Sequence, residues 1–349
     1  MKIGLLIYGS LDTLSGGYLY DRKLVEYLRA QGDTVEVISL PWRNYAAHLM
    51  DNFSFRLPPG LDVLIQDELN HPSLIFTNRN KPYPVISLVH HLRCSEFRPK
   101  WQNWFYQIIE KRYLQSVDGF IFNSQTTRSV VEGLLADEKP FLVAYPPTDR
   151  FGIGATQAEI EARAQAAGPL RILFLGNVIE RKGLHTLLEA FVALKGLPIR
   201  LEVVGSLKSE AAYAVMVQRY AGERAPGMVT FHGALDNDAL VAQLKAAHLL
   251  AVPSSYEGFG IVYLEGMGFG LPAIATNSGA APEIIGEGRT GYLIAAGDSK
   301  TLAARLAEIA ENRVLLTELS RNALARYRQQ PAWTQTAAQI RAFLEAQIV

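Results

Sequence analysis

Short apolar segments alternate with amphipathic segments along this chain of 349 residues, and the alternation occurs twice. Segments of strand length in the first half are 3–8, 34–40, 62–65, 85–89, 119–122 and 141–145, and those in the second half are 170–176, 201–205, 229–233, 249–253 and 273–276. Such alternation predicts parallel sheets with helices on both faces. We therefore expect an α/β protein with two doubly wound, Rossmann-like domains, whose ligands bind beyond the carboxyl ends of the strands.

The domain boundaries are predicted from a change in composition. Residues 156–168 are rich in Ala, Glu and Gln and lack an apolar seam, so we expect a linker between a domain of residues 1–160 and a domain of residues 168–330. The tail, 331–349, has a helical pattern with one apolar face. That face consists of Trp333, Ile340, Phe343 and Leu344. The cleft between two such domains is the expected place for a small-molecule site.

The segment 249–269 contains the most informative side chains. A short apolar strand is followed by the glycine loop 258–260, and a helix is predicted from Ile261. Backbone N–H groups at such a helix start can bind a phosphate. Glu257 lies on the loop and Glu265 in the helix, so their carboxylates can accept hydrogen bonds from hydroxyl groups on either side of a diphosphate. A nucleotide sugar has that arrangement, with a ribose on one side and a hexose on the other.

Further motifs follow Glu257 in a fixed order. They are the Glu-x7-Glu pair itself, Gly270-Leu271-Pro272, Ser278-Gly279-Ala280, Glu283 and Thr290-Gly291. This order resembles that of the family 4 glycosyltransferases, which are retaining enzymes of the GT-B fold. The resemblance implies two Rossmann-like domains facing a central cleft, the first binding the acceptor and the second the nucleotide-sugar donor. It also implies that the tail helix packs back on the first domain.

The turn 176–183 follows the first strand of the second domain. In the resembled family this turn has an Arg, and a Lys-Gly further on, and both cations bind the donor phosphates. This chain has Lys182 and Gly183 at the family's spacing, but Asn177 where the Arg is expected. Either Arg181 supplies the second cation, or Lys182 and the helix N-terminus suffice. A cation placed there would stabilise the negative charge on the departing nucleoside diphosphate.

Two features of the first domain complete the pattern. The paired glycines Gly16 and Gly17 precede a predicted helix, where they let the backbone approach an anion closely. The predicted strand 85–89 ends in His90 and His91. In the resembled family a Gly-Gly loop touches the donor phosphates, and a histidine at this strand end meets the donor sugar. The resemblance implies that His90 is the counterpart and that His91 replaces an aspartate; a purely structural role for either histidine stays open.

Composition excludes several classes of protein. Lys and Arg together number 34, as do Asp and Glu, so no global field favours binding to nucleic acid. The single cysteine, Cys94, excludes an internal disulfide and a cysteine cluster for zinc. The segment 236–238 has the Asp-x-Asp form of a manganese site, but it precedes a predicted helix, 239–247, so capping of that helix is the favoured interpretation. We expect no cofactor and a metal-independent enzyme.

The start of the chain leads directly into a predicted strand, and no apolar segment approaches the length of a membrane span. We therefore expect a cytoplasmic protein, at most peripheral at the inner face of a membrane. One helical region mixes aromatic and basic side chains, namely Phe97, Trp101, Trp104, Phe105, Tyr106, Lys111 and Arg112. Weak contact with a lipid surface is one interpretation. A buried or interdomain helix face is the favoured one.

The residues and the resemblance together predict a retaining, metal-independent glycosyltransferase that moves a hexose from a nucleoside-diphosphate sugar to a glycan, lipid or small-molecule acceptor. The resemblance assigns catalytic roles to Lys182, Glu257 and His90. The predicted donor-binding residues are Gly16, Gly17, Asn177, Arg181, Lys182, Glu257, Gly258, Phe259, Gly260, Ile261 and Glu265. Two alternatives stay open: a nucleotide-sugar 2-epimerase of the same fold, and a catalytically silent nucleotide-sugar-binding protein, which Asn177 favours.

Overall fold

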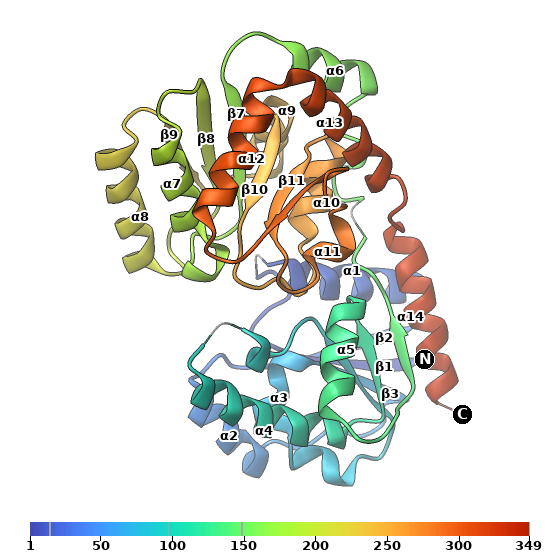
Figure 1. The fold of residues 1–349 in the computed structure, drawn as a ribbon. Helices are drawn as coiled ribbons and strands as arrows, with labels where there is room; N and C mark the ends of the chain where they lie inside the picture. The colour runs from blue at the N-terminus through green and yellow to red at the C-terminus, as the bar shows by residue number, and fades with distance from the viewer. Residues whose placement is uncertain (14, 97, 148, 349) are drawn as a thin grey trace. The chain divides into compact units, whose positions relative to one another are not determined.

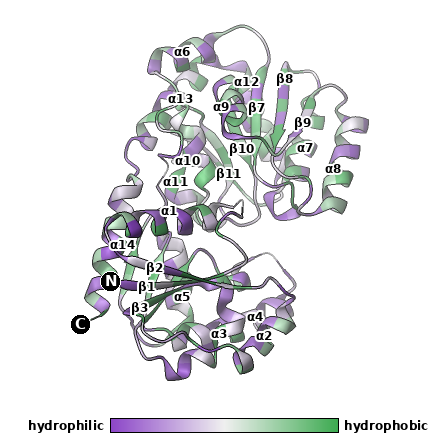
Figure 2. Ribbon diagram, turned by 180° about the vertical axis from the view of Figure 1, so that it is seen from behind, coloured by the Kyte–Doolittle hydropathy of each residue, from purple (hydrophilic) through white to green (hydrophobic). Residues whose placement is uncertain are grey.

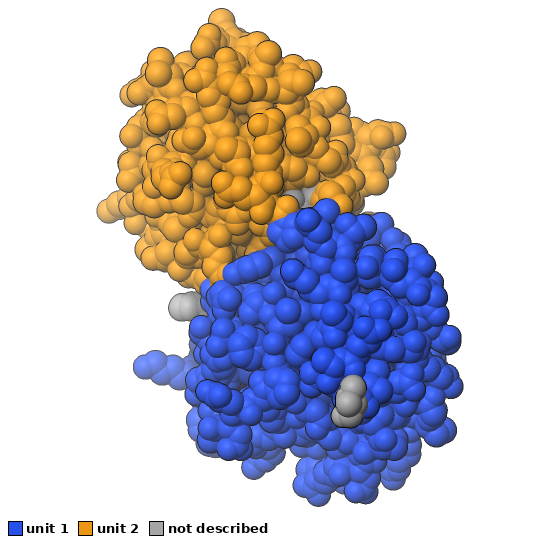
Figure 3. Space-filling view, turned by 90° about the vertical axis from the view of Figure 1, so that its right-hand side faces the viewer, with its two compact units in different colours: residues 1–147, 331–349 blue, residues 148–330 orange. Residues whose placement is uncertain are grey.

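The structure, a computed structural model, describes residues 1–349 except 14, 97, 148 and 349 (Figure 1). The chain forms two compact units, which are coloured separately in Figure 3. Residues 1–147 and 331–349 make up unit 1, and residues 148–330 make up unit 2. Each unit is a parallel sheet with helices on both of its faces.

The described part of unit 1 contains a six-stranded parallel sheet in the order β2-β1-β3-β4-β5-β6. Its strands are β1 (Lys2–Tyr8), β2 (Thr34–Leu40), β3 (Val63–Asp67), β4 (Val85–Val89), β5 (Gly119–Phe122) and β6 (Phe141–Val143). Strands β3, β4 and β5 are buried along their whole length, which explains why they are mostly apolar rather than alternating. The strand order reverses between β1 and β3, so the loops after these strands diverge there and leave room for a site.

Helices cover both faces of the sheet in unit 1. They are α1 (Gly16–Ala30), α2 (Tyr45–Ser54), α3 (His71–Leu74), α4 (Lys100–Ser116), α5 (Gln125–Leu134) and α14 (Trp333–Gln347), with 3-10 turns η1 (Glu68–Asn70), η2 (Thr77–Asn80) and η3 (Arg93–Ser95). Tyr20 and Leu24 of α1 and Ile340 of α14 pack in one apolar cluster. Tyr113 of α4 and Val131 of α5 pack in another. The last helix of the chain therefore contributes to the core of unit 1.

The described part of unit 2 contains a second six-stranded parallel sheet in the order β12-β11-β10-β7-β8-β9. Its strands are β7 (Leu170–Leu175), β8 (Ile199–Val204), β9 (Val229–Gly233), β10 (Leu249–Val252), β11 (Ala273–Thr276) and β12 (Gly291–Ile294). Strands β10 and β11 are buried along their whole length, and Figure 2 shows their hydrophobic character. The chain winds from β7 outward to β9 and then returns through β10, so the loops after β7 and β10 meet at the switch point.

The helices of unit 2 connect these strands. They are α6 (Gln157–Gln165), α7 (Leu184–Ala193), α8 (Ala211–Arg224), α9 (Asn237–Ala246), α10 (Ile261–Gly268), α11 (Ala281–Ile284), α12 (Ser299–Glu311) and α13 (Arg313–Tyr327), with the 3-10 turn η4 (Glu180–Lys182). Helix α9 begins after Asp236, whose carboxylate accepts a hydrogen bond from the backbone N–H of Ala239 at 2.9 Å. The predicted capping role of this Asp-x-Asp segment is confirmed.

The prediction of a linker at 156–168 is wrong. Most of this segment forms helix α6, which Thr156 and Glu159 begin with a reciprocal capping box. Ile160 and Ala164 are buried one turn apart and hold the helix against α13 of unit 2. A seam of only two small or medium apolar residues is too short to show as helical periodicity. The chain passes from unit 1 to unit 2 between residues 147 and 148, earlier than the predicted boundary at 160–168.

Helix α4 exposes aromatic side chains, contrary to the favoured prediction of a buried face. Trp101 and Trp104 are 69% and 64% exposed, whereas Glu110 and Tyr113 are buried. Each tryptophan precedes one of these buried residues by nine positions, about 2.5 helical turns, so the two pairs lie on opposite faces. Phe97 of the same prediction lies outside the described residues. Among the helices that the structure describes, none combines the length and hydropathy needed to cross a membrane.

Candidate active site

The loops that follow β7 and β10 contact each other closely at the switch point of unit 2. Gly183 has a φ of +69°, and a Cβ atom on it would lie 2.1 Å from the carbonyl oxygen of Pro253. The backbone N–H of Ser255 donates to the carbonyl of Arg181 at 2.8 Å. Glycine at 183 is therefore required by both the left-handed backbone and the close approach. The contact brings Lys182 of one loop against Glu257 of the other.

Lys182 and Glu257 form a buried ion pair. The ammonium Nζ lies 2.5 Å from Glu257 Oε1, which also accepts a hydrogen bond from Ser254 Oγ at 2.6 Å. Burial raises the pKa of Glu257, but the charges of Lys182 and Arg181 outweigh it and leave that pKa below its usual value. Burial also lowers the pKa of Lys182, and Glu257 opposes that shift. Each partner thus stabilises the charged form of the other in this buried pair.

Arg181 lies beside this pair. Its Nη1 donates to the carbonyl of Tyr256 at 2.6 Å and lies 3.9 Å from Glu257 Oε2. A second cation is therefore present next to Lys182, although Asn177 stands where the family resemblance leads one to expect an arginine. Asn177 is half-buried at the end of β7, and its carbonyl accepts from the N–H of Ile179 at 2.9 Å. The structure thus places Arg181 near the same carboxylate that Lys182 contacts.

Glu265 lies in the second turn of α10 and is only 5% exposed. Its Oε1 lies 3.3 Å from Nη1 of Arg150, and Nη2 of the same arginine donates to Asn237 Oδ1 at 2.6 Å. Burial raises the pKa of Glu265, and Arg150 partly opposes the shift. Sequence reasoning missed Arg150, since it precedes its partner by 115 positions and belongs to no motif.

The loop 258–260 connects β10 to α10. Gly260 is the N-cap of α10 with a φ of +96°, and the cap makes no side-chain hydrogen bond. Phe259 is buried, while Gly258 and Ile261 are half-buried. The N-terminal end of α10 therefore carries its positive partial charge next to Glu257, in a loop whose backbone has no Cβ at two of its three positions.

The Ser-Gly-Ala step at 278–280 explains how the position of Glu257 is fixed. The backbone N–H of Ala280 donates to the carbonyl of Glu257 at 2.9 Å, and Gly279 forms a β-bridge with the same glutamate. A Cβ on Gly279, whose φ is +71°, would lie 2.0 Å from that carbonyl oxygen. The motif thus holds the backbone of Glu257 in place, a role that motif spacing alone does not predict.

In unit 1, the predicted residues Gly16, Gly17 and His90 come together at the carboxyl ends of β1 and β4. Gly16 and Gly17 form the first turn of α1, which Ser15 caps by accepting from the N–H of Tyr18 at 3.3 Å. A Cβ on Gly17 would lie 3.3 Å from Cδ2 of His90. His91 instead pairs with Glu96, through an Nε2–Oε1 distance of 3.0 Å. Of the two histidines, His90 is the one that lies against the glycine pair.

Carboxylates and histidines gather in two buried groups in the described part of unit 1. One group is Asp21, Asp67 and His90, and the other is Glu68, His71 and Glu110. In each group the oxygen and nitrogen atoms lie within 4.8 Å of one another. The fold assembles them from separate elements, so no sequence spacing reveals them. In the second group, Glu110 accepts from the backbone N–H groups of Arg93 and Cys94, which gives it a structural role.

Comparisons with known proteins show which family and which solved structures this chain resembles. The family described as "Glycosyl transferases group 1" matches residues 156–326. The D-rhamnosyltransferase WbpZ of Pseudomonas aeruginosa is 30% identical over 270 residues, which cover 72% of this chain and 68% of that relative. Sucrose-phosphate synthase from Thermosynechococcus elongatus has a TM-score of 0.84 at 20% identity, covering 99% of this chain and 98% of that chain. Anabaena HepE, solved in complex with UDP-glucose, has a TM-score of 0.76 at 18% identity, covering 99% and 100%.

The two sheets and their helices, together with the structural likeness, show the GT-B fold. At identities of 18% and 20%, the solved structures establish the fold alone. The sequence matches go further: this chain belongs to the glycosyl transferases group 1 family.

Proposed function

We propose that this protein is a retaining glycosyltransferase of the family 4 type, which transfers a hexose from a nucleoside-diphosphate sugar to a glycan, lipid or small-molecule acceptor without a metal ion. The buried pair of Lys182 and Glu257 at the switch point of unit 2 is the observation that carries the proposal. It places one cation and one hydrogen-bond acceptor side by side, next to the N-terminus of α10. A diphosphate and a sugar hydroxyl require those two partners.

The donor residues then take distinct roles. Lys182, with Arg181 and the backbone of 258–260, binds the diphosphate, and Glu257 accepts hydrogen bonds from the hexose. Glu265 accepts from the ribose hydroxyls, and Arg150 holds its carboxylate. Gly16, Gly17 and His90 of unit 1 would act at the reacting centre, as the family resemblance implies. The structure of HepE in complex with UDP-glucose makes that donor the first to test.

Charge stabilisation supports the metal-independent form of the proposal. Departure of the nucleoside diphosphate creates negative charge, which Lys182, Arg181 and the N-termini of α7 and α10 would stabilise together. The acceptor would attack on the face from which the diphosphate leaves, and a leaving phosphate oxygen would take the acceptor's proton. Glu257 already pairs with Lys182, so it is poorly suited to be the nucleophile of a double displacement.

A thermal-shift panel tests the donor site. It should contain UDP, GDP and ADP and their glucose, galactose, mannose and N-acetylglucosamine conjugates. A ligand at 100 times its dissociation constant stabilises the fold by about 2.7 kcal/mol, enough to raise the Tm by a few degrees. A shift with one nucleotide family supports the donor site, and no shift with any of them contradicts it.

Product analysis then separates the proposed transfer from its alternatives. Transfer of the hexose to an added acceptor, with the anomeric configuration kept, supports the proposal. Epimerised donor formed without acceptor would indicate a 2-epimerase. Loss of activity in EDTA that manganese restores would contradict metal independence.

The exposed face of α4 supports peripheral membrane contact as a further part of the proposal. Trp101 and Trp104 are exposed there together with Lys100, Lys111 and Arg112, while Glu110 of the same helix is buried. Aromatic and basic side chains on one helix suit the headgroup region of an anionic bilayer. Co-sedimentation with vesicles containing phosphatidylglycerol, lost in W101S/W104S and absent with phosphatidylcholine alone, is the expected result. Equal sedimentation of the parent and the variant would contradict this part.

A further inference from the structure

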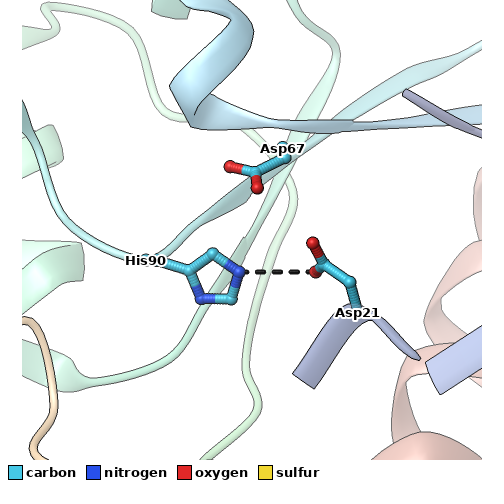
Figure 4. A group of neighbouring side chains, drawn as sticks. All are labelled: Asp21, Asp67 and His90. Atoms are coloured by element: carbon cyan, nitrogen blue, oxygen red, sulfur yellow. Dashed lines mark hydrogen bonds and ion pairs between the residues drawn. The ribbon is translucent and has the colours of Figure 1, made fainter. Parts of the chain in front are cut away.

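Asp21, Asp67 and His90 form a buried group within unit 1, drawn in Figure 4. Asp21 comes from α1, Asp67 ends β3, and His90 directly follows β4. The side chain of Asp21 is fully buried, and that of His90 is 13% exposed. Asp21 Oδ1 lies 3.4 Å from His90 Nε2, and this is the ion pair that the figure marks.

The carboxylate of Asp21 depends on this histidine. Its Oδ2 is buried, and no donor among the described residues makes a hydrogen bond to it. A buried carboxylate without compensation is costly, and the cost falls when an opposite charge lies beside it. The imidazolium form of His90 provides that charge, and Asp21 in turn favours the imidazolium over the neutral ring.

The orientation of the ring follows from the same contact. Because Nε2 faces Asp21, the other nitrogen, Nδ1, lies on the edge of the ring that points away from both aspartates (Figure 4). Gly17 packs close to the Cδ2 edge of the ring, since a Cβ atom on Gly17 would lie only 3.3 Å from His90 Cδ2. Tyr20 lies edge-on to the ring, with the ring centroids 5.5 Å apart. Three neighbours on α1 therefore fix how His90 presents its second nitrogen.

We propose that Asp21 is a positioning residue, which keeps His90 an imidazolium and leaves its Nδ1–H as a hydrogen-bond donor for the transferred sugar. The part that concerns the sugar rests on the proposed function. The part that concerns Asp21 and His90 rests on contacts within unit 1 alone.

The charges around His90 support this assignment. Burial lowers the pKa of His90, but Asp21, Asp67 and Glu68 outweigh it and raise the pKa to about 9. Burial, and after it the charge of Asp21, raises the pKa of Asp67 to about 8. These shifts favour the protonated carboxyl of Asp67 and the imidazolium of His90 at neutral pH.

Two tyrosines on α1, Tyr18 and Tyr20, do not titrate near neutral pH. Tyr18 donates to the carbonyl of Tyr8 at 2.6 Å, and Tyr20 donates to the carbonyl of Ala144 at 3.0 Å. Burial raises the pKa of both hydroxyl groups, so both stay neutral. Glu68 is the remaining carboxyl group that acts on His90, and burial raises its pKa to about 7. Asp21, Asp67 and Glu68 are thus the carboxyl groups whose charges act on His90.

Histidine NMR of the full chain tests the first part without any donor. The seven histidines are labelled, and His90→Gln identifies the signals of His90. We expect the parent to titrate near pH 9 and Asp21→Asn to lower that pKa by at least about one unit. Asp67→Asn should lower it less, and this second variant keeps the test available if Asp21→Asn does not fold. A His90 that titrates near 6.5 in the parent, or equally in parent and Asp21→Asn, would overturn the proposal.

Kinetics test the second part. Asp21→Asn should lower kcat at pH 8 by tenfold or more, with little change in the KM for the donor, and should move the alkaline fall in activity to lower pH. Asp21→Glu should restore part of the rate, and Glu26→Gln, an exposed residue on the same helix, should match the parent. Loss of rate at an unchanged pH profile would show a merely structural role and overturn the proposal. Stabilisation of the parent, but not of Asp21→Asn, by added Zn²⁺ or Mn²⁺ would overturn it in favour of a metal site.

These measurements separate the two parts. A lowered His90 pKa in Asp21→Asn together with no transferase activity in the parent would contradict the proposed function while supporting the pairing of Asp21 with His90. An unchanged His90 pKa in an active enzyme would contradict the pairing alone.

Discussion

The ammonium of Lys182 lies 2.5 Å from the carboxylate of Glu257, although 75 positions separate the two residues in the chain. The contact joins the loop after β7 to the loop after β10 at the point where the strand order of unit 2 reverses. Each charge compensates the other in a buried site. Removal of one partner therefore leaves a buried charge with less compensation, which lowers the free energy of unfolding.

Lys182→Ala should lower transferase turnover at least tenfold, because the charge that stabilises the departing diphosphate is lost. Loss of the ammonium should also lower the stability of unit 2 by up to about 3–5 kcal/mol, the cost of breaking a buried pair, because among the described residues only Arg181 and Ser254 still compensate Glu257. Initial rates with saturating donor, together with the Tm, measure both effects. Lys195→Ala, an exposed lysine of the same unit, is the control and should match the parent. Turnover near that of the parent would remove Lys182 from the mechanism.

Glu265→Ala should weaken the binding of free UDP and of UDP-glucose to a similar extent, because the proposed contact is to the ribose that both ligands share. A loss of about tenfold, or about 1.4 kcal/mol, is expected for one hydrogen-bond pair to a charged group. Isothermal titration calorimetry with UDP alone makes the measurement. Glu189→Ala, an exposed glutamate of unit 2, should leave the affinity unchanged. Equal affinity of parent and Glu265→Ala for UDP would exclude the ribose contact.

Gly279→Ala should destabilise unit 2, because the new Cβ would lie 2.0 Å from the carbonyl oxygen of Glu257 and the φ of +71° disfavours any side chain. We expect a loss of about 1–3 kcal/mol and weaker donor binding, since the backbone of Glu257 has to move. Gly222→Ala in α8 is the matched control. Nothing lies within 4 Å of its Cβ position, and alanine is the better helix former, so its Tm should equal or exceed that of the parent. Equal Tm values for the two variants would contradict this account.

The sequence predicts those parts of the structure that depend on local patterns. Strand β4 was predicted with the bounds that it has, because its five residues are apolar and buried along their whole length. Helix α6 was missed, because only Ile160 and Ala164 mark its buried side. The pairs Arg150–Glu265 and Asp21–His90 join residues 115 and 69 positions apart, so each depends on the tertiary fold. Motif spacing indicated the glutamates and Lys182, while the side chains that hold them in place are determined by the fold.

The pH dependence of stability provides a test of His90 that needs no substrate. Folding raises the pKa of His90 from 6.5 to about 9, since Asp21, Asp67 and Glu68 outweigh the effect of burial. The stabilisation from the imidazolium is therefore complete below pH 6.5 and is lost as the pH rises through about 9.

The Tm of the parent should exceed that of His90→Gln most at pH 6.5, and the difference should shrink steadily toward pH 9. Titrating groups that do not act on His90, such as Glu110, are common to both proteins and largely cancel in the difference. His232→Gln in unit 2 controls for the loss of a histidine outside the group, and differential scanning calorimetry at matched ionic strength makes the comparison. A Tm difference that stays constant or grows between pH 6.5 and 9 would show that His90 is not held as an imidazolium.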